Sequence, residues 1–174
     1  MSFFSNLFKS KQQNSQVLLV SPIKGKYVPL ENVSDPVFAS KSMGQGFATR
    51  FNEDSGVVSV FSPISGTIDN IFPTKHAIGI ISSDKKSNIL IHMGIDTVTL
   101  DGKGFEVFVN EKSKINAGDL IAKINLDVLK EKNLISDIMV LVLPDSEKLN
   151  ISPISELNAE QSVEVNEPLF EVRY

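Results

Sequence analysis

Short apolar runs separated by turn residues fill the chain from Val17 to Tyr174. Typical runs are VLLV, VVSVF, AIGII, NILI and DIMVLVL, and the gaps between them hold turn sequences such as DSG, DGKG and AGD. Each run has the length of a β-strand, and the gaps carry residues that favour tight turns. About a dozen short strands at this spacing predict an all-β fold, an antiparallel β-sandwich or barrel-like arrangement.

Helical periodicity is confined to short stretches. The segment LDVLKEKNL, residues 126–134, predicts one helix with Asp127 as its cap. A further helical turn is predicted near residues 153–157. The expected fold therefore has only one or two very short helices.

The first sixteen residues differ from the rest and are expected to form a flexible tail before a single domain spanning residues 17–174. Phe3, Phe4, Leu7 and Phe8 recur on one helical face and are followed by Lys9 and Lys11. Two interpretations stay open: a frayed terminus, or a short amphipathic segment that makes weak contact with a membrane surface.

Two sequence echoes suggest that the domain contains two similar β-units packed face to face. The segment SPIKG at residues 21–25 matches SPISG at 62–66, and INAGDLIAKI at 115–124 resembles VEVNEPLFEV at 163–172. Each echo reads as a turn followed by a strand. The echoes are too short to separate a duplication from turn chemistry that is similar by chance.

Composition narrows the classes of function. The 174 residues include 17 Lys and Arg, 21 Asp and Glu, two His and no Cys, with a formal charge of −4. The acidic balance argues against nucleic-acid binding. The absence of Cys excludes disulfides and thiolate chemistry and fits a reducing, cytoplasmic location. No apolar run reaches the length of a transmembrane helix.

The only two histidines are expected to lie close together. His76 and His92 flank two apolar runs joined by a polar loop. A five-residue loop, 83–87, would set Ile78 opposite His92 and put both imidazoles on one face, roughly 7–8 Å apart at Cα. A three-residue loop would place the histidines directly opposite each other, and an even-length loop would put them on opposite faces.

Several common chemistries lack support. No G-x-S-x-G elbow and no G-x-x-x-x-G-K-[ST] phosphate loop occurs. Two imidazoles supply only half the ligands of a structural zinc site. What remains is an imidazole whose own ring nitrogen acts as a nucleophile.

The sequence IHMGIDTVTLDGKGF, residues 91–105, closely resembles the active-site signature of a bacterial family, h-H-h-G-I-D-T-V-x-L-x-G-x-G-F. That family is the glucose-class IIA component of the phosphoenolpyruvate-dependent sugar phosphotransferase system. The flanking blocks at 21–48, 61–78 and 115–121 agree with the family in order, so the resemblance covers the chain from about Val17 to Tyr174.

The resemblance implies a phosphocarrier with a phosphohistidine intermediate on Nε2 of His92. The donor would be the phosphohistidine carrier protein HPr, and the acceptor a cysteine of the IIB domain of a sugar permease. His76 would stabilise the phosphoryl group, Thr74 would hydrogen-bond into the histidine pair, and Asp96 would dock arginines of partner proteins. Departures from the family pattern are Gln45, where an acid is common, and Leu90, where Phe is common.

A site that serves two protein partners has to be open, and an apolar rim would dock them. The candidates for this rim are Phe38, Met43, Phe47, Phe72 and Leu90. Two other interpretations remain. The chain could act mainly as a regulatory binding module that reports sugar supply through its phosphorylation state. His76 and His92 could also bind a divalent metal, such as Zn at a partner interface, although the phosphocarrier role requires no cofactor.

Overall fold

The computed structural model describes residues 16–146 and 150–174, which form three antiparallel sheets. The predicted tail therefore lies outside the described residues except for Gln16, which begins β1. The large sheet has the strand order β13 (Ser162–Val163), β2 (Gly25–Val28), β3 (Gln45–Phe51), β11 (Ile138–Val142), β7 (Asn88–Met93), β6 (Ala77–Ser82), β5 (Gly66–Ile71) and β9 (Lys114–Ile115).

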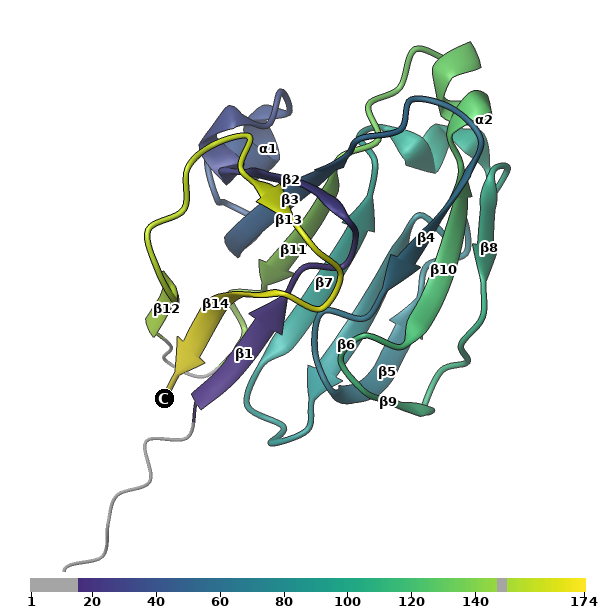
Figure 1. Ribbon diagram of the computed structural model, residues 1–174. Coiled ribbons are helices and arrows are strands. Elements are labelled where there is room, and N and C mark those ends of the chain that lie inside the picture. The colour runs from purple at the N-terminus through teal and green to yellow at the C-terminus, as the bar shows by residue number, and fades with distance from the viewer. Residues whose placement is uncertain (1–15, 147–149) are drawn as a thin grey trace, which may run out of the picture.

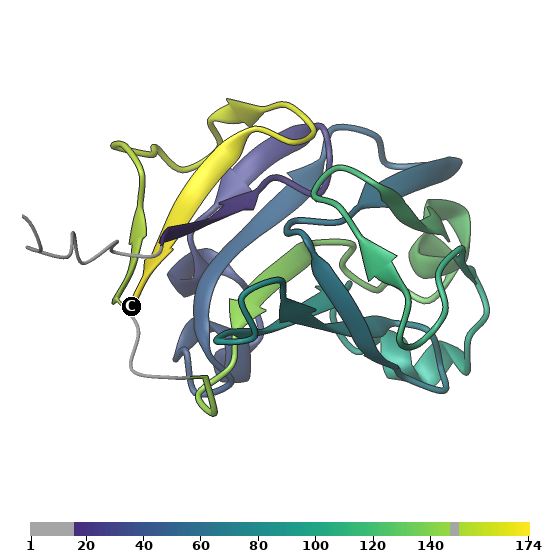
Figure 2. The ribbon, with the colours of Figure 1, turned by 90° about the horizontal axis from the view of Figure 1, so that it is seen from below.

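Two three-stranded sheets cover one face of the large sheet (Figure 1). One has the order β4 (Val57–Phe61), β10 (Leu120–Asn125) and β8 (Phe105–Val107), and the other β1 (Gln16–Val20), β14 (Pro168–Arg173) and β12 (Asn150–Pro153). In Figures 1 and 2, β1 and β14 lie side by side although they are distant in sequence. The predicted all-β antiparallel sandwich is confirmed.

Alternating side chains assign the strands of the large sheet to two apolar layers. Ile89, Ile91 and Met93 of β7 enter the main core, between the large sheet and the small sheets. Leu90 of the same strand joins a second cluster on the opposite, outer face. The central strand β11 is buried on both faces, which explains its uninterrupted run IMVLV.

The helices are short and differ in part from the prediction. α2 (Leu126–Glu131) lies where a helix was expected, but the Asn125 side chain, and not Asp127, caps it by accepting a hydrogen bond from the Asp127 amide. The helical turn predicted near 153–157 is wrong, because Pro153 still belongs to β12 and bends follow it. α1 (Pro36–Ala39) and two 3-10 turns, Leu30–Asn32 and Thr97–Leu100, complete the helical elements of the described residues.

The two sequence echoes occupy equivalent structural positions. In each SPI turn the serine hydroxyl donates to the isoleucine carbonyl two residues later, at 2.7 Å for both Ser21 and Ser62. The Ser21 backbone exchanges hydrogen bonds with Asn166 and Glu167, and Ser62 does so with Gly118 and Asp119. The prediction of two similar β-units is therefore confirmed at the level of turns and strand pairing.

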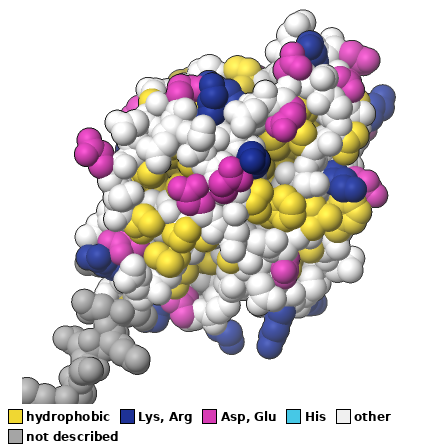
Figure 3. Space-filling view, viewed as in Figure 1, with side chains coloured by type: hydrophobic (Ala, Val, Ile, Leu, Met, Phe, Trp, Pro, Cys, Tyr) yellow, Lys and Arg dark blue, Asp and Glu magenta, His cyan; other side chains and the backbone are white. Residues whose placement is uncertain are grey.

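No helix within residues 16–146 and 150–174 combines the length and the hydropathy that crossing a membrane requires. The face drawn in Figure 3 carries patches of apolar side chains among acidic and basic ones, and no histidine is visible on it.

Candidate functional site

His92 stands in the middle of the outer face of the large sheet. It is the penultimate residue of β7, with Ala77 of β6 and Met139 of β11 directly opposite on either side. The edge of the Phe38 ring, from α1, packs against the imidazole with centroids 4.9 Å apart. Ala77 is small and Met139 is unbranched, and the imidazole that lies between them is half-buried.

The protonation pattern of the His92 ring follows from one contact. Nδ1 lies 2.8 Å from the carbonyl oxygen of Gly94. A carbonyl oxygen only accepts hydrogen bonds, so Nδ1 carries the proton and the neutral ring has its lone pair on Nε2. This is the nitrogen that a nucleophilic role for His92 requires.

Gly94 is the residue whose backbone makes this contact possible. Its φ of 79° lies in the left-handed region that glycine adopts without strain. A Cβ at this position would lie 2.5 Å from Cγ2 of Thr97 and 2.8 Å from the Ile135 carbonyl oxygen. The glycine after His92-Met93 therefore allows both the turn and the close packing around it.

The two histidines converge as predicted, but by a different route. The β6–β7 loop has four residues, 83–86, and sets Ala77, not Ile78, opposite His92. The predicted five-residue register is therefore wrong. The Asp84 carboxylate accepts bonds from the Ser82 hydroxyl and the Lys86 amide, which closes the shorter loop.

An even-length loop would place the histidines on opposite faces if both lay in strands. His76, however, precedes β6 and belongs to a turn in which Lys75 has a φ of 57°. The turn releases His76 from strand alternation and brings its ring to the outer face. The two imidazole centroids are 4.9 Å apart, with ring planes at 77°.

Thr74 and Phe72 hold the His76 ring. The Thr74 hydroxyl lies 2.6 Å from Nδ1 of His76, and the Phe72 ring packs edge-on with a centroid distance of 5.5 Å. When the hydroxyl donates to Nδ1, the imidazole carries its proton on Nε2 and can donate it elsewhere. The predicted contact between Thr74 and the histidine pair is present.

Both imidazoles are neutral at neutral pH. The pKa of His92 is lowered to about 4, chiefly by burial and then by the neighbouring His76, while the Gly94 carbonyl, Asp35 and Asp96 act in the opposite direction. Burial also lowers the pKa of His76. A nucleophile on His92 is thus available without prior loss of a proton.

Two carboxylates lie on one side of the site. Asp96 is exposed, and Asp35 lines the same pocket of about 240 Å³. Asp35 also accepts hydrogen bonds from the amides of Val37 and Phe38, which begins α1 and so places the Phe38 ring. Sequence reasoning found Asp96 and missed Asp35, although an acid directly before a proline is a signal of a helix start.

Four of the five predicted rim residues lie on the outer face. Phe38 and Leu90 are buried in the second cluster, and Met43 and Phe72 are half-buried against it. The assignment of Phe47 to the rim is wrong: its ring points into the main core and stacks on Phe170 at 5.1 Å. Phe47 alternates with Ala48 on β3, and Ala48 takes the outer position.

The histidine pair offers two metal ligands. Nδ1 of each ring is already hydrogen-bonded, which leaves only the two Nε2 atoms. No group of three or more His, Cys, Asp or Glu side chains that could hold a metal ion occurs in the described part of the chain. A tetrahedral zinc site would need its other ligands from another molecule. Zn at a partner interface thus stays a prediction.

Known proteins are similar to this chain along most of its length. Residues 17–148 match the family model described as phosphoenolpyruvate-dependent sugar phosphotransferase system, EIIA 1. A PTS system glucose-specific EIIA component from Staphylococcus aureus (strain Mu50) is 41% identical over 151 residues, 85% of this chain and 88% of the relative.

Two further comparisons agree with this match. A PTS system glucose-specific EIIA component from Staphylococcus epidermidis is 39% identical over 154 residues, 87% of this chain and 90% of the relative. Among solved structures, the glucose permease IIA from Mycoplasma capricolum superposes with a TM-score of 0.75 at 31% identity and covers 91% of this chain and 96% of that one.

Proposed function

Because the chain belongs to the EIIA 1 family of the phosphoenolpyruvate-dependent sugar phosphotransferase system, we propose that it carries a phosphoryl group on Nε2 of His92. The donor is the phosphohistidine of the carrier protein HPr. The acceptor is a cysteine on the IIB domain of a sugar permease, of the glucose class since the relatives bear that name. The observation that carries the proposal is the Nδ1 contact with Gly94, which leaves Nε2 as the nucleophile.

In the accepting step, Nε2 of His92 attacks the phosphorus of the donor. A new P–N bond forms as the P–N bond to the donor imidazole breaks, and the donor ring leaves with its electron pair. After the transfer, Nε2 of His92 bears the phosphoryl group and Nδ1 still bears its proton. The Gly94 carbonyl accepts from a ring that bears positive charge, which strengthens that hydrogen bond.

His76 is proposed to stabilise the phosphoryl group. Its centroid lies 4.9 Å from that of His92, and the Thr74 hydroxyl can hold its Nδ1 as an acceptor. Nε2–H of His76 can then donate to a phosphoryl oxygen. Phosphoryl transfer depends mainly on positioning and charge stabilisation, and a preorganised donor in a partly buried site supplies both.

Asp35 and Asp96 are proposed to dock cationic side chains of the protein partners. They line one pocket, and both act electrostatically on His92. Complementary charge steers association and fixes the orientation of the partner. In the acceptor step, the cysteine thiolate attacks the phosphorus, and the P–N bond to His92 breaks.

The test is a reconstituted transfer reaction. The protein is incubated with phosphoenolpyruvate, the first enzyme of the system and HPr, and the phosphate is located by mass spectrometry and by phosphorus NMR. We expect acid-labile, base-stable phosphate on Nε2 of His92, absent when HPr is omitted. Adding a purified IIB domain should discharge it, and a IIB domain with its cysteine replaced by serine should not. Phosphate on any other residue would refute the assignment.

A further inference from the structure

A row of charged side chains crosses the outer face of the large sheet next to the histidines. Lys26 of β2 stands opposite Arg50 of β3. The Arg50 side chain reaches Asp137, which directly precedes β11, and the Asp137 carbonyl accepts a hydrogen bond from the Gly94 amide. The row therefore ends at the glycine whose carbonyl holds His92.

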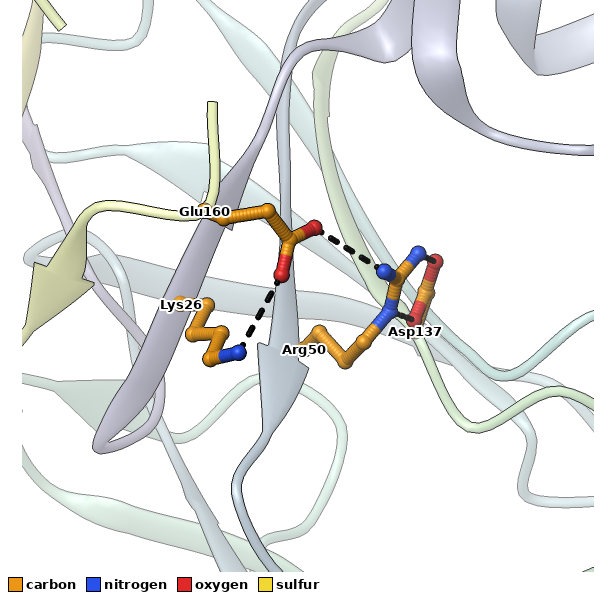
Figure 4. Close-up of polar contacts among 4 residues, drawn as sticks. All are labelled: Lys26, Arg50, Asp137 and Glu160. Atoms are coloured by element: carbon orange, nitrogen blue, oxygen red, sulfur yellow. Dashed lines mark hydrogen bonds and ion pairs between the residues drawn. The ribbon is translucent and has the colours of Figure 1, made fainter. Parts of the chain in front are cut away.

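Arg50 and Asp137 form a paired, partly buried contact (Figure 4). Nε and Nη2 of Arg50 donate to Oδ1 and Oδ2 of Asp137 at 2.8 and 2.9 Å. The Asp137 side chain is only 2% exposed, against 40% for Arg50. Removing one member of such a pair leaves a buried charge without compensation, which is far more disruptive than losing a surface ion pair.

Glu160 extends this contact toward the solvent. Its carboxylate accepts from Nη1 of Arg50 at 3.0 Å and pairs with Nζ of Lys26 at 3.4 Å, as Figure 4 shows. Arg50 is thus held on two sides. A guanidinium in this position fixes the carboxylate of Asp137 in angle as well as in distance.

The backbone of Asp137 connects the Arg50–Asp137 pair to the histidine site. Its carbonyl accepts from the Gly94 amide at 2.9 Å, and the Ile135 carbonyl accepts from the Ile95 amide at 2.9 Å. Gly94 has no side chain, and its conformation at φ 79° depends on such backbone contacts. The Gly94 carbonyl in turn accepts from Nδ1 of His92 at 2.8 Å.

We propose that Arg50 and Asp137 are positioning residues that, through Gly94, keep His92 in the tautomer with Nδ1 protonated. Neither side chain touches the phosphoryl group. When this paired contact is lost, the side chain at position 137 moves away from Arg50, the carbonyl of residue 137 shifts, and the Gly94 carbonyl no longer meets Nδ1. His92 then also populates the Nε2–H tautomer, whose Nε2 has no lone pair. Its relevance to phosphoryl transfer rests on the proposed function of His92.

The experiment reads the tautomer directly, by NMR of the ¹⁵N-labelled histidine rings in the unphosphorylated full-length protein. The chain has only two histidines, so the two ring signals are assigned with His76→Gln and His92→Gln. Three variants disturb the contact between Arg50 and Asp137 to different degrees. Arg50→Lys keeps the charge, Asp137→Asn opposes amide protons to the guanidinium, and Arg50→Met leaves the carboxylate unpaired. Glu164→Gln is the matched control, since it breaks an exposed pair with Lys24.

We expect pure Nδ1–H at His92 in the parent and in Glu164→Gln. Asp137→Asn and Arg50→Met should show a mixture with Nε2–H, and Arg50→Lys should lie close to the parent. Phosphate acceptance from HPr should slow by about threefold to tenfold in Asp137→Asn and Arg50→Met, which is the loss expected when one neutral hydrogen bond is removed. If Arg50→Met does not fold, Asp137→Asn carries the same test, because it buries no unpaired charge.

Folded variants with the parent's ring spectrum would overturn the proposal. That outcome is distinct from failure of the phosphocarrier role, which would show as a parent protein with pure Nδ1–H that accepts no phosphate. A slower reaction with an unchanged tautomer would also refute the positioning role, since the effect would then reach the site by another path.

Discussion

The two faces of the large sheet are both apolar, but they are closed to different degrees. The inner face is sealed by the two small sheets, and Ile91 on it is fully buried. In the described part of the chain, residues of α1 and of neighbouring turns pack on the outer face, and His92, the next residue along β7, remains partly accessible there. Adjacent residues of one strand thus have different roles. Ile91 stabilises the fold from the inner face, and His92 places a partly buried imidazole on the outer face.

The partial cover of the outer face has a chemical result. It is deep enough to lower the pKa of His92 to about 4, so the ring is neutral. It still leaves the His92 ring partly exposed, and Asp35 and Asp96, which act electrostatically on this ring, line one pocket. A fully sealed face would desolvate the imidazole equally well but would exclude a protein partner.

The largest effect expected on the outer face is that of His92→Gln. Phosphate acceptance from HPr should be abolished, because the nucleophilic nitrogen is gone. The free energy of unfolding at pH 7 should stay within about 1 kcal/mol of the parent, since the change is at a half-buried site. Acceptance is measured by incorporation of labelled phosphate, and stability by urea unfolding. Undiminished acceptance would show that His92 is not the acceptor.

Ile91→Ala is the counterpart on the inner face. Its side chain is fully buried in the main core, so the truncation should lower the free energy of unfolding by about 2–5 kcal/mol. Acceptance by the protein that remains folded should be unchanged when rates are corrected for the folded fraction. A selective loss of acceptance in stable Ile91→Ala protein would mean that the two faces are not separable.

His76→Gln sharpens the comparison within the outer face. Acceptance by His92 should be largely intact, whereas onward transfer to the IIB domain should slow by about 10²-fold, the cost of one preorganised donor. Single-turnover kinetics of the two steps give the ratio. Equal losses in both steps would assign His76 a role in folding or in nucleophilic attack.

The desolvation of the outer face predicts a pH dependence of stability. The pKa of His92 is 6.5 in the unfolded chain and about 4 in the folded one, so between these values the unfolded state binds more protons. Stability conferred by neutral His92 is complete above pH 6.5 and is lost as the pH falls toward 4. Relative to His92→Gln, the parent should lose up to about 3 kcal/mol over this range. Urea unfolding at several pH values gives this difference. An equal change in the free energy of unfolding of the two proteins between pH 7 and pH 4 would contradict the prediction.

The smallest effect is expected for Thr74→Val, which removes the hydroxyl at Nδ1 of His76 and keeps the shape of the side chain. Onward transfer should slow by about threefold to tenfold, as for the loss of one hydrogen bond. Ser113→Ala, whose hydroxyl donates to the exposed Asn110 carbonyl away from the site, is the control and should transfer at the parent's rate. Equal rates for both variants would remove Thr74 from the site.

Much of this organisation was accessible from sequence because it depends on local chemistry. The strands follow from runs of apolar residues, and the equivalence of the two SPI turns follows from identical residues in identical roles. The convergence of His76 and His92 was predicted, but the register was wrong, since a one-residue change in loop length depends on how the Asp84 carboxylate closes the turn.

Other features depend on contacts between segments that are distant in sequence. Phe38 and Phe47 are both aromatic residues in the same stretch of sequence. Phe47 packs on Phe170 in the main core, whereas Phe38 packs on His92 at the site, and these distant partners distinguish the two. The link from Arg50 through Asp137 to Gly94 joins β3 to residues beside the ends of β11 and β7, and the order of these strands in the sheet is not their order in the chain. Pattern analysis of one strand at a time carries no information on such neighbours.

The pairing of β1 with β14 has a consequence for how the protein reaches this state. Gln16 and Glu171 meet across a separation of 155 residues, and β12 also binds β14 and not β1. Closing so long a loop is entropically costly and slows folding, and it has to wait until β14 has been synthesised. Among the described strands, β1 emerges first during translation and remains an unpaired, partly apolar edge, the kind of strand that associates with other chains. Chaperone occupancy of nascent chains should accordingly persist until the segment Pro168–Arg173 leaves the ribosome.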